Sequence, residues 1–276
     1  CFIHSGMIAL AIESTAHTFG IGIINEGGNV LSNVRDMFKP ELGKGFTPFG
    51  LAEHHYIISS KVLDDALKES KLKIKDADVI VFSQGMGIPN SLKVGAALAR
   101  YLALKYKKPL IGVNHGIAHI EIGKLKTGAK NPVIVYLSGG NSQILAYVDD
   151  RYRVFGETLD IPVGNALDVL AREMGLTMPG GPEIEKLAKN GSYIHLPYTV
   201  KGTDLSFTGI LTATIEKFKE GVSKEDIAYS MQEVCFSMLT EVTERALAHT
   251  GKGEVLLVGG VAANRRLQEM MKIMCG

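Results

Sequence analysis

The sequence predicts an α/β protein built from two similar lobes, and three observations support this. The chain has 276 residues, enough for two lobes or one large α/β unit. Residues 8–24 and 132–148 begin alike, with an apolar strand, a turn of small polar residues and a second strand. Helical patterns alternate with further strands after both segments. A unit that recurs once at this distance indicates an internal duplication, because repeat arrays have far shorter periods.

The first lobe is expected at residues 7–130, with Gly128–Asn131 as the boundary. Each expected strand is an apolar or β-branched run bounded by turn residues, and each helix follows a 3.6-residue period. The expected elements are strands 8–12, 19–24 and 30–35, helix 50–69, strand 78–82, helix 91–106, strand 109–113 and helix 115–125. Residues 1–6 precede Met7 and are interpreted as a vector-derived remnant outside the fold.

The second lobe is expected at residues 131–276 and repeats this beginning. Its expected elements are strands 132–137, 143–148 and 152–155, helices 163–174, 181–190, 207–220 and 223–249, strand 254–258 and helix 262–274. Two such lobes facing each other would bring both small-residue turns to one cleft. A cleft of this kind is where an α/β protein is expected to bind its ligand.

The composition is that of an ordinary globular protein. With 30 Lys and Arg against 29 Asp and Glu, the net charge is +1, so no general basic field indicates a nucleic-acid partner. If RNA binds, a local patch or another subunit must supply the positive charge. The three cysteines fit a reducing cytosol, and Cys235 lies in a helical apolar stripe that predicts a packed core thiol. No run is long enough to span a bilayer, so we expect a cytoplasmic protein without a membrane partner.

His115 and His119 are the first candidate site residues. Histidines four residues apart share one face of a helix, which is the spacing a metal ion needs. The pair directly follows a buried strand, where a helix N-terminus opens toward the expected cleft, and we therefore favour metal binding over two structural histidines. The adjacent pair His54 and His55 points in two directions, which favours structure or cleft lining.

Ser138-Gly139-Gly140-Asn141 is the candidate phosphate loop. Small residues let backbone N–H groups approach an anion, although a Gly-Gly hairpin turn is the commoner use of such a sequence. Glu13-Ser14-Thr15, at the equivalent place in the first lobe, adds hydroxyls that could converge on the same phosphate. No Gly-x4-Gly-Lys-Ser/Thr motif occurs in the chain.

Three further features each have two interpretations, one functional and one structural. Asn264 follows Gly259-Gly260 at a strand-to-helix junction and could contact a ribose or base, or could cap the helix. Asp168 and Glu185, on either side of Pro179-Gly-Gly-Pro182, could grip ribose hydroxyls or a metal, or be solvated charges. Lys105-Tyr-Lys-Lys108 could touch RNA, although a solvated helix end is the commoner meaning.

The motifs occur in the order seen in one known family. They are His115-x-x-x-His119, Tyr136-Leu-Ser-Gly-Gly-Asn141, Asp168, Pro179-Gly-Gly-Pro-Glu183, Asp204-Leu-Ser-Phe-Thr-Gly209 and Gly259-Gly-Val-Ala-Ala-Asn264. From Met7 to its last residue, the chain resembles the tRNA N6-adenosine threonylcarbamoyltransferases, a family once described as O-sialoglycoprotein endopeptidases. The start, Ile12-Glu-Ser-Thr-Ala-His-Thr-Phe-Gly20, is similar to the archaeal members, which are catalytic subunits of the KEOPS complex.

The resemblance implies an actin, sugar-kinase and heat-shock-chaperone-like (ASKHA) fold. It also implies transfer of threonylcarbamoyl from its adenylate to N6 of the adenosine after the anticodon, in tRNAs that read ANN codons. The implied partners are tRNA, a KEOPS-type kinase subunit and a small dimerising subunit.

The resemblance also implies the site residues. The metal, iron or alternatively zinc, would be held by His115, His119 and Tyr136, which are also the catalytic candidates. The nucleotide, ATP or threonylcarbamoyl-AMP, would be held by ten residues. These are Tyr136, Leu137, Ser138, Gly139, Gly140, Asn141, Asp168, Gly181, Glu185 and Asn264.

Two departures from the family pattern stand out. Where members usually carry an Arg–Glu pair before the two adjacent histidines, this chain has Phe49–Gly50. Members also continue with a strand and an Asp-Asn-Gly segment whose Asp completes the metal site, whereas this chain ends at Gly276. The resemblance therefore implies a truncated C-terminus and a missing carboxylate ligand.

Three other activities fit the sequence less well. An ASKHA-type kinase would need an Asp base in the cleft and would have no use for the histidine pair, and a non-catalytic ATP-binding scaffold would retain tRNA modification without the histidines. A zinc protease is disfavoured because the His-Glu-x-x-His arrangement is absent.

Overall fold

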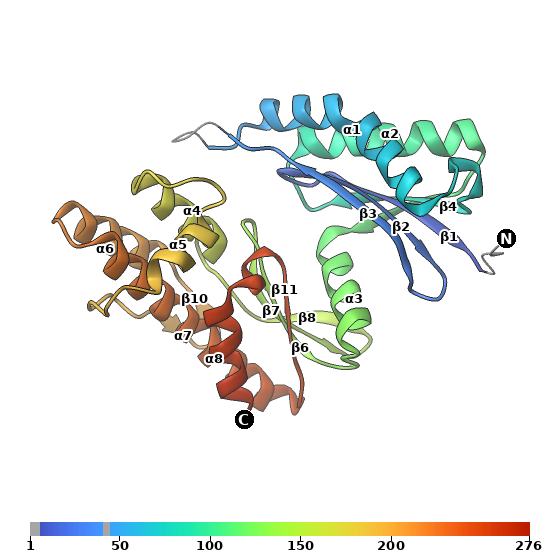
Figure 1. Cartoon of the computed structure of the whole chain (residues 1–276). Helices are drawn as coiled ribbons and strands as arrows, with labels where there is room; N and C mark the ends of the chain where they lie inside the picture. The colour runs from blue at the N-terminus through green and yellow to red at the C-terminus, as the bar shows by residue number, and fades with distance from the viewer. Residues whose placement is uncertain (1–5, 41–44) are drawn as a thin grey trace. The chain divides into compact units, whose positions relative to one another are not determined.

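The computed structural model describes residues 6–40 and 45–276, which form two compact units (Figure 1). One unit comprises residues 6–40 and Phe46–Ala118, and the other comprises residue 45 and residues 119–276. The division falls inside helix α3 (His115–Thr127), twelve residues before the lobe boundary expected from the sequence. Apart from Gly6, the segment interpreted as a vector remnant lies outside the described residues.

The first unit is a five-stranded sheet in the order β3-β2-β1-β4-β5. Strands β1 (Ile8–Glu13), β2 (Thr18–Asn25) and β3 (Val30–Met37) form an antiparallel meander, and β4 (Val79–Gly85) and β5 (Leu110–Asn114) run parallel to β1. Because the three parallel strands end at one edge, the residues that follow β1 and β5 lie at the same end of the sheet.

Helices α1 (Pro48–Ser70) and α2 (Pro89–Tyr106) cover one face of this sheet (Figure 1), with a short 3-10 turn at Ile74–Asp76 between them. Thr47 caps α1 by accepting a hydrogen bond from the Gly50 N–H at 3.1 Å, and the helix ends at Lys71 in the left-handed conformation. Alternate residues of β1 and β2, including Leu10 and Ile21, are buried beneath the helices.

The second unit contains a four-stranded sheet in the order β11-β6-β7-β8. Strands β6 (Val133–Leu137), β7 (Ser142–Val148) and β8 (Arg151–Glu157) form a meander, and β11 (Val255–Val258) runs parallel to β6. A meander with a parallel strand beside its first strand is also the plan of the first unit, which confirms the predicted duplication. The two-residue strands β9 (Val200–Lys201) and β10 (Asp204–Leu205) were not expected.

Helices account for most of the core of the second unit. They are α4 (Val163–Glu173), α5 (Gly180–Ala188), α6 (Thr208–Lys219), α7 (Lys224–Thr250) and α8 (Arg265–Cys275), with a 3-10 turn at Gly260–Ala263. Ser223 accepts a hydrogen bond from the Asp226 N–H and begins α7, and Gly251, with φ of +65°, ends it.

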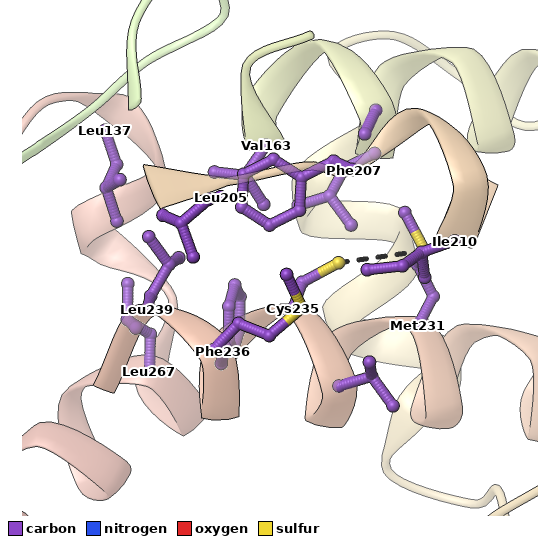
Figure 2. Close-up of a cluster of buried hydrophobic side chains, with 14 of the residues drawn as sticks. Leu137, Val163, Leu205, Phe207, Ile210, Met231, Cys235, Phe236, Leu239 and Leu267 are labelled. Carbon is purple, nitrogen blue, oxygen red and sulfur yellow. Dashed lines mark hydrogen bonds between the residues drawn. The ribbon is translucent and has the colours of Figure 1, made fainter. Parts of the chain in front are cut away.

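The central helix of this core is α7. In Figure 2, Phe207 and Leu205 face Cys235 and Phe236 of α7, and all four side chains are fully buried. Cys235 Sγ lies 3.9 Å from Met231 Sδ, and burial raises the pKa of the thiol. The predicted core thiol is thus confirmed. No helix among the described residues is long and apolar enough to cross a bilayer.

Candidate functional site

The part of the site in the first unit centres on His115, the first residue of α3. Asn114 ends β5 and caps α3, its Oδ1 accepting a hydrogen bond from the Ile117 N–H at 3.2 Å. Glu13, the last residue of β1, places its Oε2 3.0 Å from His115 Nδ1, and Thr15 Oγ1 lies 3.4 Å from the same nitrogen. The parallel strands β1 and β5 end at the same edge of the sheet, with β4 between them, and therefore deliver a carboxylate to one side of the imidazole.

The local electrostatics keep Glu13 ionised. Burial raises the pKa of its carboxyl, but the hydrogen bond and charge of His115 and the bonds from Thr15 outweigh it, so this pKa lies below its usual value. The Thr15 N–H donates to Glu13 Oε1 at 2.6 Å. An ionised carboxylate only accepts hydrogen bonds, so the proton of His115 resides on Nδ1, and Nε2 becomes the nitrogen suited to binding a metal.

His119 and Tyr136 meet in the second unit. Their ring centroids are 5.6 Å apart with the planes inclined by 38°, and Tyr136, in the central strand β6, is 1% exposed. Two imidazoles one helical turn apart and a phenol are donors that iron and zinc accept, so the residue types fit such a metal. Among the described residues, no group of three or more His, Cys, Asp and Glu side chains could hold a metal.

The loop at residues 138–141 joins β6 to β7. Ser138 Oγ accepts hydrogen bonds from the Gly140 N–H at 3.2 Å and the Asn141 N–H at 3.0 Å, and the Ser138 N–H donates to the Asn141 carbonyl. The hairpin-turn reading is therefore correct as far as local structure is concerned. A Cβ added at Gly139 or Gly140 would meet no atom within 4 Å, so this side of the loop has room for a ligand.

Two glycines, Gly164 and Gly259, lie very close to the backbone of this loop. Gly164, in the first turn of α4, has no room for a side chain, because a Cβ there would lie 2.5 Å from the Ser138 carbonyl oxygen. Gly259, with φ of +94°, follows β11, and a Cβ there would lie 2.2 Å from the Leu137 oxygen. The ends of the parallel strands β6 and β11 and the start of α4 thus come together, as expected for a ligand-binding edge.

Asp168 and Gly181 are joined at the start of α5. Asp168 Oδ1 accepts a hydrogen bond from the Gly180 N–H at 2.7 Å. Burial raises the pKa of Asp168, and the backbone bonds from Gly180 and Gly181 oppose that rise only in part. The carboxylate thus holds the glycine pair and caps α5, and its contact with a ribose stays a prediction.

Glu185 and Asn264 both accept hydrogen bonds from backbone N–H groups at the start of α8. Glu185 Oε1 accepts a hydrogen bond from the Arg265 N–H at 3.0 Å. Asn264 is 7% exposed, and its Oδ1 accepts from the N–H groups of Arg266 and Leu267 while its Nδ2 donates to Gln232 Oε1. The cap reading of Asn264 is therefore correct, and its contact with ribose or base stays a prediction.

The structure also tests the expectations for the adjacent histidines His54 and His55 and for Ser14. His54 and His55 are structural, since His55 is fully buried and donates from Nε2 to the Ala16 carbonyl at 2.9 Å, and His54 Nε2 lies 2.8 Å from Asp36 Oδ1. The Ser14 hydroxyl is not accessible to a phosphate. It is buried against α2, because a Cβ at Gly95 would lie 2.1 Å from it.

Sequence reasoning missed the partnership of Glu13 with His115. It assigned residues 13–15 to a phosphate, although strand order carries a signal for the other role: residues that end parallel strands near one another meet at one edge. It also missed Asp160, whose carboxylate accepts hydrogen bonds from Ser206, Phe207 and Thr208 and so holds the start of α6.

Comparison with known proteins identifies the family of the chain. The sequence profile of the family TsaD, tRNA N6-adenosine threonylcarbamoyltransferase, matches residues 28–276. A protein of that name from Thermococcus sibiricus is 61% identical over 270 residues, which cover 97% of this chain and 82% of that protein. A "Probable bifunctional tRNA threonylcarbamoyladenosine biosynthesis protein" from Methanobrevibacter smithii is 53% identical over 97% of this chain and 50% of that protein.

Solved structures of low sequence identity share the fold. T. kodakarensis HypF superposes with a TM-score of 0.66 at 16% identity, over 98% of this chain and 44% of that chain. The activator of 2-hydroxyisocaproyl-CoA dehydratase from Clostridium difficile gives 0.58 at 16% identity, over 98% and 85%. These neighbours confirm the ASKHA fold. On the strength of the family match over residues 28–276, the chain belongs to the tRNA N6-adenosine threonylcarbamoyltransferases, which are acyltransferases.

Proposed function

We propose that this chain transfers the threonylcarbamoyl group of threonylcarbamoyl-AMP to N6 of the adenosine that follows the anticodon, in tRNAs that read ANN codons. The observation that carries the proposal is the family match over residues 28–276, with relatives of that activity at 61% identity. Within the first unit, the contact of the Glu13 carboxylate with His115 adds support, because a carboxylate of this kind orients an imidazole for a metal.

The reaction is an acyl transfer. The adenosine amine attacks the carbamoyl carbon and forms a C–N bond, the bond from that carbon to the phosphate oxygen breaks, and AMP departs with the electron pair. The amine loses one proton to the surrounding solvent. Because AMP is already a good leaving group, the reaction needs positioning and stabilisation of oxyanion charge more than a strong base.

The second unit would provide the binding site for the AMP portion of the substrate. The open side of Gly139 and Gly140 would receive the phosphate, and the first turn of α4, which packs against this loop, adds the positive end of a helix dipole. Asp168 holds Gly181 in place, and Glu185 and Asn264 hold the start of α8. We assign these residues to the nucleotide, which is ATP in the absence of the acyl adenylate.

A divalent metal, iron or zinc, would be held by His115, His119 and Tyr136 and would supply a Lewis acid that stabilises the oxyanion. In this chain, Glu13 orients His115 so that Nε2 is presented and the ring cannot rotate freely. Tyr136 is fixed within the buried strand β6, and His119 packs on its ring. Rigid supports of this kind hold the donors in place before a ligand arrives.

We further propose that the chain acts within a KEOPS-type assembly, with a kinase subunit and a small dimerising subunit. The protein from Methanobrevibacter smithii supports a second component, because it is named bifunctional and this chain spans only half of it.

The test is the double variant His115→Ala and His119→Ala, assayed with the partner subunits. We expect it to lose both its metal content, measured by elemental analysis, and threonylcarbamoyl transfer to unmodified tRNA. The matched control is His195→Ala with His249→Ala, two histidines outside the site, and it should retain both. Undiminished transfer by the first variant would remove the metal role and favour a non-catalytic scaffold.

A further inference from the structure

An acid-free stretch of the chain lies in the first unit. Residues 79–120 contain five cations, Lys93, Arg100, Lys105, Lys107 and Lys108, and no Asp or Glu. The remaining 25 Lys and Arg face 29 acids, so the rest of the chain carries a net charge of −4. The near-neutral total therefore conceals a strongly basic segment.

Folding gathers four of these cations where α2 ends and β5 begins. Arg100, Lys107 and Lys108 line a hollow of about 450 Å³ together with the apolar residues Ala103, Leu104 and Leu110. We call these six residues the basic hollow. None of its three cations forms an ion pair within residues 6–40 and 45–276.

Next to the hollow on α2 is an exposed aromatic side chain, Tyr101, which contacts the ammonium group of Lys105. Tyr101 is 55% exposed, and Lys105 Nζ donates a hydrogen bond to its hydroxyl at 2.8 Å while lying 5.2 Å from its ring centroid. Lys105 Nζ also lies 5.7 Å from the Tyr106 ring. Cations beside an exposed aromatic ring are the combination by which proteins hold nucleic-acid backbones and bases.

We propose that the basic hollow binds the phosphate backbone of the tRNA substrate. The proposal rests on the proposed function, which requires tRNA to bind. Complementation of the C-terminal helix dipole does not explain the cluster, because that effect fades within the last turn and Arg100 lies six residues before the end of α2. The apolar lining residues would contact the ribose, and the cations would replace counterions of the phosphates.

The hollow contains none of the residues assigned to the metal or to the nucleotide. Lys108 and His115 are seven residues apart in the chain, so their Cα atoms are separated by at most about 25 Å. Loss of the basic hollow should weaken tRNA affinity without altering the nucleotide site.

The test compares two triple variants of equal charge change in the full chain. The first is Arg100→Gln, Lys107→Gln, Lys108→Gln. The control, Lys75→Gln, Lys189→Gln, Lys219→Gln, changes exposed lysines that have acids within four residues. Binding of an unmodified tRNA transcript is measured across about 50–200 mM KCl.

We expect the slope of log affinity against log salt to fall by about 2 to 3 for the first variant and by less than about 1 for the control. Near 0.15 M salt, the first variant should bind tens-fold to about 100-fold more weakly. The single variants Arg100→Gln and Lys107→Gln should each lower the slope by about 1, which keeps the test decisive if the triple variant folds poorly.

Wild-type affinity and slope in the first variant, or an equal loss in the control, would overturn this inference and leave the proposed function intact. Wild-type protein that binds no tRNA at all would instead overturn the proposed function, and this inference with it. ATP binding, measured in parallel, should stay unchanged in both variants.

Discussion

His55 should make the first unit sensitive to mild acid. This fully buried imidazole donates from Nε2 to the Ala16 carbonyl, and its Nδ1 lies 3.1 Å from His54 Nδ1. Burial and the charge of His54 lower the pKa of His55 to about 4. Protonation would place an additional positive charge in the buried interior, beside His54.

The pKa shift sets the size of the effect. The unfolded chain takes up this proton near pH 6.5 and the folded chain near pH 4, so the unfolded state binds more protons between these values. Stability is therefore fully present above about pH 6.5 and is lost as the pH falls toward 4. The loss would be about 2 kcal/mol at pH 5 and at most about 3.4 kcal/mol below pH 4.

Urea unfolding between about pH 7.5 and pH 4.5 measures this loss. The variant His55→Gln keeps a donor for the Ala16 carbonyl but cannot titrate, so it should be less stable at neutral pH and show a flatter pH profile. Exposed His195→Gln should keep the wild-type profile. Identical pH dependence in wild type and His55→Gln would refute the reasoning.

Two further predictions concern the site. Glu13→Gln should weaken metal binding by about 10- to 100-fold in a chelator competition, because the carboxylate that orients His115 is lost; Thr15→Val, at the longer 3.4 Å contact, should lose less. An equal loss in both variants would contradict the assigned role of Glu13. Asn264→Ala removes the cap of α8 and leaves Gln232 without its partner, so the free energy of unfolding should fall by about 1 to 2 kcal/mol. No change in unfolding would contradict the cap.

Most of the fold was predictable because its elements are long and strongly patterned. The two meanders, β4, β11 and the helices from α1 to α8 follow apolar periodicity that residues of one segment reveal. Strand β5 was expected to be buried, but its Leu110 and Ile111 are exposed. The hairpin β9–β10 escaped because two-residue strands carry no periodic signal. The end of the first unit within α3, rather than at residues 128–131, depends on packing between distant segments.

The site was predictable in its residue types and less so in its contacts. The pair His115 and His119 follows from helical spacing, whereas the bond from Glu13 depends on strand order. Asn264 could not be resolved in advance, because a glycine pair and an asparagine before a helix suit both a cap and a ligand contact. Burial of Ser14 against Gly95 likewise arises only when β1 and α2 pack.

The bond between Glu13 and His115 joins residues 102 apart in the chain. Such a contact forms only after β4 has inserted between β1 and β5, since β4 separates those strands in the sheet. Closing so long a loop delays non-local contacts during folding. The orientation of the imidazole therefore depends on assembly of all three parallel strands of the first unit. A substitution that slows the insertion of β4 would then reduce metal loading of newly made protein while leaving every ligand in place.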